Sequence, residues 1–127
     1  MSRAVIGCAI EVHRSLGPRL LEPAYHRCLE HELTLEKVPY QSEVPLPVRY
    51  KGTRLDCGYR MDLVIHEHLT VELKSVRKIE PIHEAQLLTY MRLSGLKVGL
   101  LINFNVPLLR EGIRRFVINQ PMKLCVL

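Results

Sequence analysis

Residues 59–76 read YRMDLVIHEHLTVELKSV, and this stretch predicts the centre of the fold. It contains two apolar runs, residues 59–65 and 69–76, each with the length and composition of a strand. Three charged side chains stand inside these runs: Asp62, Glu72 and Lys74. Because burying an unpaired charge costs free energy, each of them needs an opposite charge, hydrogen bonds or solvent beside it. We expect the two strands to lie at the centre of a sheet.

The length of the loop between these strands decides which side chains face each other. A three-residue loop, 66–68, places Asp62 directly opposite Glu72, with their Cβ atoms about 4.5 to 5.5 Å apart. Strand alternation adds Lys74 to the same face. Two carboxylates this close repel unless one is protonated or a cation lies between them. A two-residue loop would instead pair Asp62 with Leu73 and disperse the group.

The rest of the chain predicts helices and further strands around this pair. Apolar residues at helical spacing, with proline or glycine at the expected ends, predict helices at residues 4–16, 22–37 and 81–95. Alternation and short apolar runs predict strands at 41–50, 98–104 and 113–118, with a turn of helix at 107–112. Two prolines within 41–50 favour a sheet edge for that strand. The order implies an α/β fold of the mixed α+β type, with a mixed sheet flanked by helices.

Two local details follow from the same patterns. Lys51-Gly52 predicts a turn after the strand at residues 41–50. The helix at residues 22–37 should turn four side chains to the core: Ala24, Cys28, Leu29 and Leu33.

The composition is that of an ordinary globular chain. Of 127 residues, 47% are hydrophobic and 24% are charged, which argues against disorder, collagen and coiled coil. This length suffices for one hydrophobic core, so we expect residues 1–127 to form a single domain. The net charge of +5 favours an anionic partner, although many proteins with such a charge bind no nucleic acid.

The sequence predicts a cytoplasmic protein with no membrane partner. The longest apolar run, residues 98–109, is broken by polar residues and is shorter than the roughly 20 residues of a membrane span. Glu11 and Arg14 interrupt the N-terminal apolar stretch, which argues against a signal peptide. Cys125 is third from the end, so the tail is no prenylation motif. The four cysteines form no C-x-x-C pair, and reduced thiols are expected.

Two carboxylates and a lysine on one strand face have the parts required for phosphodiester hydrolysis. A divalent cation held between Asp62 and Glu72 would bind the scissile phosphate and lower the pKa of a water molecule. Lys74 would orient that water or stabilise the charge that develops in the transition state. The alternative from spacing alone is a solvated Glu-x-Lys pair on an open sheet face, because such short motifs also match by chance.

The same residues resemble a known signature. Asp62, nine intervening residues and then Glu72-Leu73-Lys74 are similar to the Asp, Glu-x-Lys signature of the PD-(D/E)XK nuclease superfamily. Over residues 4–118 the chain resembles more narrowly the GxxExxY protein family, a small branch of that superfamily. The segments that carry this second resemblance are Ala9-Ile10-Glu11-Val12-His13, Leu16-Gly17-Pro18, Leu20-Leu21-Glu22 with Tyr25, Gly58-Tyr59-Arg60, His83-Glu84-Ala85-Gln86-Leu87-Leu88 and Gly99-Leu100-Leu101-Ile102-Asn103-Phe104.

The resemblance implies a fold, an activity and a cofactor. The fold would be a restriction-endonuclease-like core with a central mixed sheet of four to five strands. The activity would be that of a nuclease dependent on Mg²⁺, with Mn²⁺ as a substitute. One departure concerns Arg19, which stands where the name-giving motif has its first glycine. A glycine allows positive φ or close backbone approach, so Arg19 either changes the helix entry or adds a phosphate contact. Pro23 inside the motif is also atypical.

The resemblance also implies a third carboxylate. Glu22, at the start of the second predicted helix, would join the metal shell directly or through water. The alternative is an acid favoured at a helix start by the macrodipole. Tyr25, one turn further on, either hydrogen-bonds a carboxylate or phosphate or is a core aromatic with a hydrated hydroxyl.

Further candidates lie on the third predicted helix and beside Asp62. His83, Gln86 and Tyr90 form one polar stripe that suggests a face turned to a cleft. The resemblance favours Gln86, since superfamily members often have a glutamine or similar group near the catalytic lysine. For His83 a capped or solvent-facing histidine is the commoner explanation. Arg60 points to the same side as Asp62 and would pair with a carboxylate or with substrate phosphate.

These observations leave more than one function open. The first is a metal-dependent nuclease that acts on nucleic acid, in the first place DNA, through backbone contacts that weaken steeply with salt. The second is a non-catalytic nucleic-acid-binding or assembly module on the same fold. A hydrolase of a small phosphoester, with a closed pocket, is the third. One chain carries one site, so cutting both strands of a duplex would need an assembly, for which a C₂ homodimer is the expected form.

Overall fold

The computed structural model of the chain describes residues 1–119. Within this range the elements, in chain order, are α1 (Ser2–Leu16), α2 (Glu22–Leu35), β1 (Tyr40–Pro45), β2 (Val48–Tyr50), β3 (Thr53–Leu55), β4 (Arg60–Ile65), β5 (Leu69–Lys74), α3 (Pro81–Ser94), β6 (Val98–Asn103), the 3₁₀ turn η1 (Leu109–Gly112) and β7 (Ile113–Val117).

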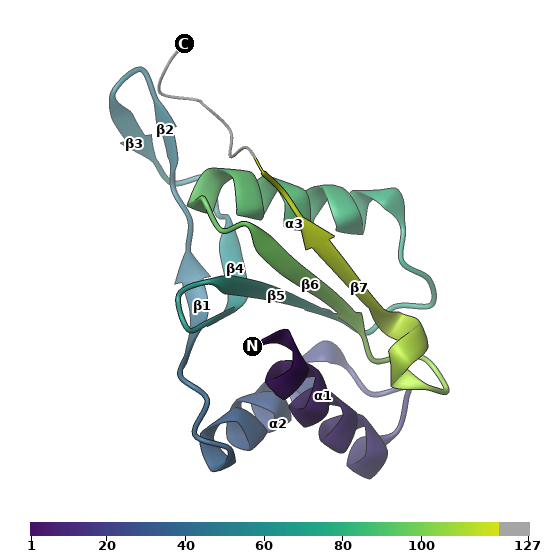
Figure 1. The fold of residues 1–127 in the computed structure, drawn as a ribbon. Helices are drawn as coiled ribbons and strands as arrows, with labels where there is room; N and C mark the ends of the chain where they lie inside the picture. The colour runs from purple at the N-terminus through teal and green to yellow at the C-terminus, as the bar shows by residue number, and fades with distance from the viewer. Residues whose placement is uncertain (120–127) are drawn as a thin grey trace.

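A five-stranded sheet forms the middle of the fold, with the strand order β1-β4-β5-β6-β7 (Figure 1). β5 and β6 are parallel and the other neighbouring pairs are antiparallel, so the sheet is mixed, as predicted. β5 is its central strand, with β4 beside it. β1 is an edge strand, which agrees with Pro45 at its end, because an inner strand would require the N–H that proline lacks.

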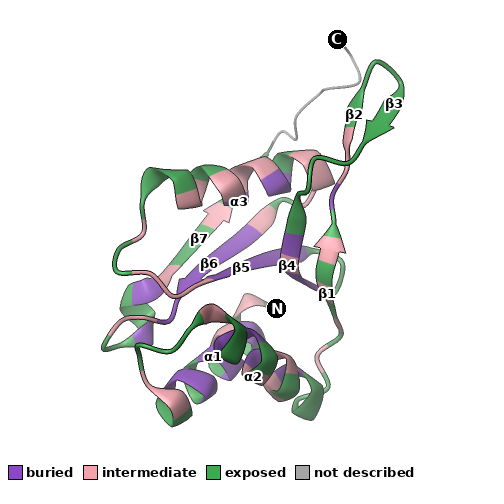
Figure 2. Cartoon of the chain, turned by 180° about the vertical axis from the view of Figure 1, so that it is seen from behind, coloured by how far each residue is buried: buried purple, intermediate pink, exposed green. Residues whose placement is uncertain are grey.

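Helices cover both faces of this sheet (Figure 1). The larger core lies between the sheet and the pair α1 and α2, and strand alternation sends Leu63 and Leu100 into it. Leu101, at the opposite parity of β6, packs instead with Leu87 and Met91 of α3. Figure 2 shows the buried positions running along β4, β5 and β6. Because both faces are covered, charged residues in β4 and β5 depend on partners close by.

The predicted strand at residues 41–50 is two strands in the structure, and a third was not predicted. β1 ends at Pro45, β2 begins at Val48, and β2 pairs with β3 in a hairpin that turns at Lys51-Gly52, as expected. The turn residues have φ angles of 49° and 77°, which is the backbone of a tight two-residue hairpin. The sequence did not indicate Thr53–Leu55 because that strand is short and fully exposed, so no apolar alternation marks it.

The second helix turns a somewhat different side to the core from the predicted one. Leu29 and Leu33 are buried as predicted, but Ala24 is exposed and Tyr25 is fully buried. Tyr25 stacks on Phe104 with 4.4 Å between the ring centroids. Because an aromatic ring removes far more apolar surface from water than a methyl group does, the tyrosine takes the inward position.

The third helix and the last strands agree with the sequence. α3 begins at Pro81, and Gly95 follows its last residue with a φ of 82°, the left-handed backbone for which glycine is favoured.

No helix within residues 1–119 is long and apolar enough to cross a membrane. Cys8, Cys28 and Cys57 are free thiols, and Cys125 lies outside the described residues.

Candidate active site

Asp62 and Glu72 meet where the pairing of β4 and β5 ends. The register runs through Leu63–Val71 to Ile65–Leu69, which confirms the prediction from a three-residue loop, and the same count places Asp62 opposite Glu72. Hydrogen bonds to side chains replace the backbone hydrogen bonds between β4 and β5 here. The N–H of Asp62 donates to Oε1 of Glu72 at 3.2 Å, and the N–H of Leu73 donates to Oδ2 of Asp62 at 2.9 Å. Each carboxyl group therefore accepts a backbone hydrogen bond from the opposite strand.

One additional residue in the turn sets this register. His66 and Glu67 have φ angles of 52° and 61°, and the N–H of His68 closes a tight turn on the carbonyl of Ile65 at 3.0 Å. Ile65 nevertheless pairs with Leu69, so His68 has no partner across the hairpin. Without that extra residue, Asp62 and Glu72 would not share a face.

β1 also departs from regular pairing beside Asp62. Ser42 pairs with Leu63 and Val44 pairs with Met61, so Glu43 is the residue opposite Asp62. Glu43 has a φ of 52°, a left-handed conformation that strand residues avoid. The ladder is thus interrupted on both sides of Asp62. Such strained backbone costs free energy and is concentrated at functional sites.

The pair is electrostatically unusual because Glu72 is only 2% exposed. Burial and the neighbouring charge of Asp62 raise the pKa of Glu72 from 4.5 to about 9, although Lys74 acts in the opposite direction. Both effects favour the protonated form of Glu72 in the absence of a cation. A positive charge between the two carboxyl groups would take the place of that proton.

Lys74 follows Glu72 on the same face of β5 and is held by α3. Its Nζ donates to Oε1 of Gln86 at 2.8 Å, and Nε2 of Gln86 donates to the hydroxyl of Tyr90 at 3.1 Å. Tyr90 is buried, and its ring lies 5.7 Å from that of Tyr59. Two residues of the predicted polar stripe therefore join the lysine in one hydrogen-bonded chain. Since an ammonium group has three donors, two remain for water or a ligand.

Glu22 is the first residue of α2 and is partly buried. Burial raises the pKa of Glu22 and the charge of Asp62 raises it further, whereas Lys74 and His26 lower it. These effects place the Glu22 carboxyl group within electrostatic range of Asp62 and Lys74. Side chains from α2, β4 and β5 thus contribute to one charged region.

Tyr25 is not directed at the carboxyl groups. Its hydroxyl donates to the carbonyl of Gly17 at 2.6 Å and accepts from the N–H of Leu20 at 3.1 Å. Of the two alternatives, the structure has the core aromatic, with backbone rather than water at its hydroxyl. Tyr25 therefore fixes the loop that leads into Glu22.

The same loop is tied to segments that follow the central strands. Arg19 has a φ of 77°, so it adopts the left-handed backbone that a glycine would favour at this position. Its N–H donates to Oδ1 of Asn105 at 3.1 Å. The hydroxyl of Ser75, directly after Lys74, donates to the carbonyl of Leu20. Arg19 therefore adopts a backbone conformation that a glycine would adopt without strain.

Sequence reasoning missed Asn103, which is 2% exposed at the end of β6. Its side chain accepts from the N–H of Val76 at 3.0 Å and donates to the carbonyl of Val76 at 2.9 Å. Asn103 thereby holds the chain as it leaves the strand that carries Lys74. An amide at the end of the apolar run 98–104 was the available signal.

A second polar cluster, also missed, joins α2 to β1. Nε2 of His26 lies 3.0 Å from Oγ of Ser42 and 3.0 Å from Oε2 of Glu30, and Ser42 also donates to Glu30. His26 lies one helical turn from Glu22. The cluster fixes the helix at whose start Glu22 stands.

Two predicted candidates take other positions. Nδ1 of His83 accepts from the N–H of Glu80 at 2.8 Å, so the histidine is part of the cap at the start of α3, the commoner of its two explanations. Arg60 is exposed and forms no ion pair within residues 1–119. Its contact with a carboxylate or with substrate phosphate stays a prediction.

The donors at the β4–β5 junction fit a hard divalent cation. Within residues 1–119, no three His, Cys, Asp or Glu side chains are gathered into a preformed metal site. The adjoining donors are Asp62 and Glu72, with Glu22 in electrostatic range. Mg²⁺ prefers oxygen ligands and is usually held by one or two carboxylates while it keeps several waters. Two opposed carboxyl groups with no closed cage suit that mode of binding.

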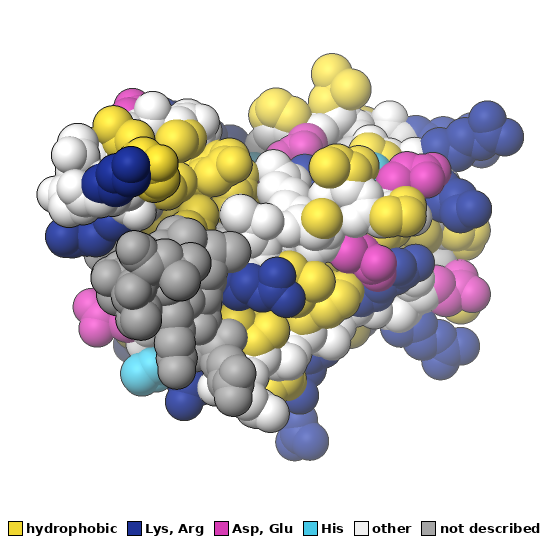
Figure 3. Space-filling view, turned by 90° about the horizontal axis from the view of Figure 1, so that it is seen from above, with side chains coloured by type: hydrophobic (Ala, Val, Ile, Leu, Met, Phe, Trp, Pro, Cys, Tyr) yellow, Lys and Arg dark blue, Asp and Glu magenta, His cyan; other side chains and the backbone are white. Residues whose placement is uncertain are grey.

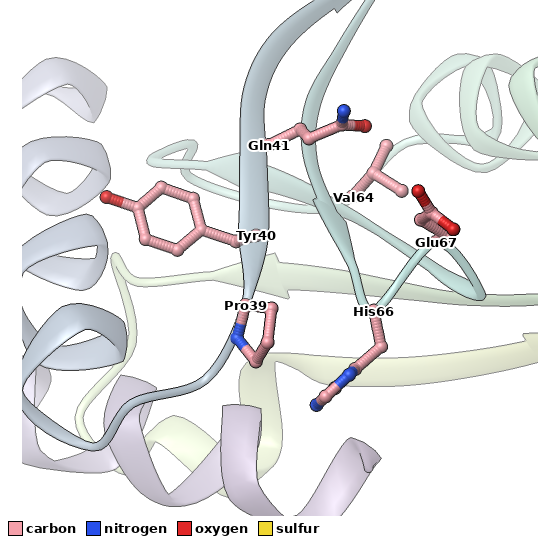
Figure 4. Close-up of a pocket in the computed structure, with 6 residues that line it drawn as sticks. All are labelled: Pro39, Tyr40, Gln41, Val64, His66 and Glu67. Carbon is pink, nitrogen blue, oxygen red and sulfur yellow. The ribbon is translucent and has the colours of Figure 1, made fainter.

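The surface carries a hollow apart from this junction and a groove beside it. A hollow near the β4–β5 turn contains none of the predicted site residues (Figure 4), and its lining is Pro39, Tyr40, Gln41, Val64, His66 and Glu67. A groove on the α3 side does adjoin the site, since Gln86 and Tyr90 line it together with Cys57, Gly58 and Tyr59. Figure 3 shows basic side chains spread over the face seen from above, with acidic ones between them.

Comparison with known proteins adds a family and a fold. A family model described as the PD-(D/E)XK nuclease superfamily matches residues 1–116. Among solved structures, the chain is similar to the one titled "Crystal structure of SSO0001", with a TM-score of 0.55 and 21% identity. The similarity covers 83% of this chain and 53% of that one, so this chain spans about half the length of that protein. At this identity the likeness shows the fold alone. No curated protein matches the chain.

Proposed function

Because this chain belongs to the PD-(D/E)XK nuclease superfamily, we propose that it hydrolyses phosphodiester bonds of nucleic acid. The observation that carries the proposal is the junction of β4 and β5. Asp62 and Glu72 are opposed there, and Lys74 follows on the same face, where Gln86 binds its ammonium group. These residues match the Asp, Glu-x-Lys signature of the superfamily in order and in spacing.

Within the superfamily we place the chain in the GxxExxY family. The support is the loop between α1 and α2, where Glu22 and Tyr25 occupy their motif positions. Arg19 replaces the glycine of the motif, but its φ of 77° keeps the backbone that glycine permits.

Asp62 and Glu72 would hold a divalent cation, and Glu22 would add a third carboxylate directly or through water. We propose Mg²⁺, with Mn²⁺ as a substitute. When bound, the cation supplies a Lewis acid for the scissile phosphate and lowers the pKa of a water molecule. The raised pKa of Glu72 supports this assignment, because burial and the charge of Asp62 make a positive charge favourable between the two groups.

Lys74 would orient the attacking water or stabilise the negative charge that develops on the phosphate. Gln86 accepts a hydrogen bond from one of the three donors of the Lys74 ammonium group, and the other two are left for the water or the phosphate. Tyr90 in turn restrains Gln86. In the reaction the water oxygen forms a bond to phosphorus and the bond to the leaving oxygen breaks.

The proposal extends to the setting of the reaction. We take DNA as the first substrate to test, in a cytoplasmic protein whose chain acts as a single domain. A C₂ homodimer would bring two sites to a duplex, because one chain supplies one set of catalytic groups.

The first experiment is calorimetric titration of Mn²⁺ and Mg²⁺ into the wild type, Asp62→Asn and Glu72→Gln, with and without short DNA and RNA duplexes. We expect the wild type to bind the cation and both variants to lose that binding. Glu67→Gln is the matched control, because Glu67 is an exposed acid in the β4–β5 turn. Cation binding that survives in both site variants would contradict the assigned ligands.

Cleavage assays with Lys74→Ala then separate an enzyme from a binding module. A nuclease loses turnover in this variant and still binds the cation. If the wild type cuts none of the DNA or RNA structures tested while it binds them, the chain is a non-catalytic nucleic-acid-binding module. If the wild type binds no divalent cation even with nucleic acid present, the catalytic proposal is wrong.

A further inference from the structure

The β2–β3 hairpin projects from the body of the protein beyond the ends of β1 and β4 (Figure 1). We infer that this hairpin is an arm that binds the phosphate backbone of a nucleic-acid duplex beside the site. The inference rests on the proposed function for the choice of ligand, and it assigns to these strands a role in holding substrate.

The central observation is a pair of arginines in direct opposition. Arg49 on β2 pairs with Arg54 on β3, so both side chains leave the same face of the ribbon. Both residues are exposed, and neither forms an ion pair within residues 1–119. Like charges directly opposite each other destabilise a strand pair. An anion bound between the two guanidinium groups would remove that repulsion.

Few other interactions in the hairpin offset this repulsion. Residues 49–55 are all exposed, so no buried core stabilises the ribbon, and an isolated two-stranded hairpin is marginal in water. Lys51 at the turn adds a third cation, with its Nζ 5.4 Å from the ring centroid of Tyr50. The nearest acid in sequence, Asp56, accepts the N–H of Gly58 at 2.8 Å. The arm itself, residues 48–55, contains these three cations and no acidic residue.

The arm follows directly on the two strands that lead to the site, since β1 runs into β2 and β3 runs into β4. Beyond Asp62, β1 and β4 pair through Val44–Met61 and Pro45–Arg60, and the N–H of Leu46 then donates to the carbonyl of Tyr59 at 2.9 Å. Arg49 is six residues along the chain from Glu43, the residue opposite Asp62, which corresponds to at most about 20 Å of strand. A duplex strand carries one phosphate per roughly 3.4 Å of helix axis, so the arm would contact phosphates within about six positions of the cut.

The shape of the arm also suits a duplex. A two-stranded ribbon fits the major groove of B-form DNA, and arginine binds phosphate through a planar fork of donors. The groove on the α3 side runs between the base of the arm, at Gly58 and Tyr59, and the residues that hold Lys74, at Gln86 and Tyr90. One ligand could therefore contact the arm and the site together.

The test compares the salt dependence of duplex binding. Fluorescence anisotropy of a short labelled DNA duplex is measured in chelator, so that no strand is cut, between about 50 and 200 mM salt. The slope of log K against log salt is negative, and each lost phosphate contact reduces its magnitude by about 0.9. Arg49→Gln with Arg54→Gln should therefore reduce the magnitude by about 1.8. The matched control, Arg3→Gln with Arg110→Gln, removes the same charge from exposed positions on α1 and η1 and should change the slope much less.

A second variant guards against loss of folding. Arg49→Glu would place opposite charges across the ribbon, which stabilises the hairpin, and should still weaken binding. The inference is overturned if the arm variants keep the slope of the wild type, or if the wild type binds no duplex. A wild type that binds through the arm but cuts nothing would refute only the proposed activity. If the wild type cuts nucleic acid but the salt slope of its binding does not depend on Arg49 and Arg54, only the proposed role of the arm is refuted.

Discussion

Lys74 on the central strand and Gln86 on α3 are joined by a hydrogen bond of 2.8 Å. The glutamine thereby fixes the position of the ammonium group. We predict that Gln86→Leu, which keeps the volume and removes the acceptor, lowers kcat by about tenfold to a hundredfold, because small misplacements of a catalytic group have effects of this size. Divalent cation affinity should not change, which calorimetry checks.

Tyr90→Phe provides a graded comparison for that prediction. It removes only the hydrogen bond of 3.1 Å that restrains Gln86, so kcat should fall by less than in Gln86→Leu. A rise in KM with kcat unchanged would show that Gln86 contacts the substrate and does not position the lysine.

The backbone conformation of Arg19 predicts an effect on stability. A non-glycine residue with a φ of 77° is strained by its Cβ atom. We predict that Arg19→Gly raises the free energy of unfolding by up to about 1 kcal/mol, while Arg19→Ala does not. Chemical denaturation measures both variants. If Arg19 also contacts phosphate, the two variants should lose duplex affinity equally, since they lack the same side chain.

A buried hydroxyl on the central strand predicts another stabilising change. Thr70 is fully buried, and its Oγ1 has no hydrogen-bond partner within residues 1–119. Thr70→Val keeps the shape and removes the unsatisfied group, so it should stabilise the protein by about 1 kcal/mol. Thr70→Ser, which keeps the hydroxyl and removes the methyl group, should destabilise it. Equal melting temperatures for wild type and Thr70→Val would contradict this explanation.

The sheet and the carboxyl pair could be predicted because local sequence determines them. Strand composition and a three-residue loop suffice to place Asp62 opposite Glu72, and the register is as predicted. Helix bounds were similarly accessible, since Pro81 and Gly95 mark the start and end of α3. These features depend on residues that are neighbours in the chain.

Two contacts near the site that were missed join distant segments of the chain. Asn103 binds the backbone of Val76, and Arg19 donates to Asn105, across 27 and 86 positions respectively. Nothing in the local pattern gives those partners. Tyr25 shows a different limit, because its hydroxyl could serve a ligand or the backbone with the same sequence spacing. Only the folded α1–α2 loop decides between these roles.

The raised pKa of Glu72 predicts a pH dependence of stability. In the unfolded chain this group titrates near 4.5, and in the folded protein near 9, because of burial and the charge of Asp62. Between these values the folded state binds one more proton than the unfolded state, so stability falls as pH rises, by up to about 1.4 kcal/mol per unit. The contribution is fully present below pH 4.5 and is lost as pH approaches 9.

Glu72→Gln isolates this effect, because the amide imitates the protonated acid and does not titrate. In chelator, denaturation at about pH 5 and about pH 8 should show the variant gaining stability over the wild type as pH rises. Glu67→Gln, at an exposed turn, should show no such trend. A stability difference between Glu72→Gln and wild type that is the same at both pH values would mean that Glu72 is ionised in the folded protein. The carboxyl pair would then have to be balanced by Lys74 rather than by a proton.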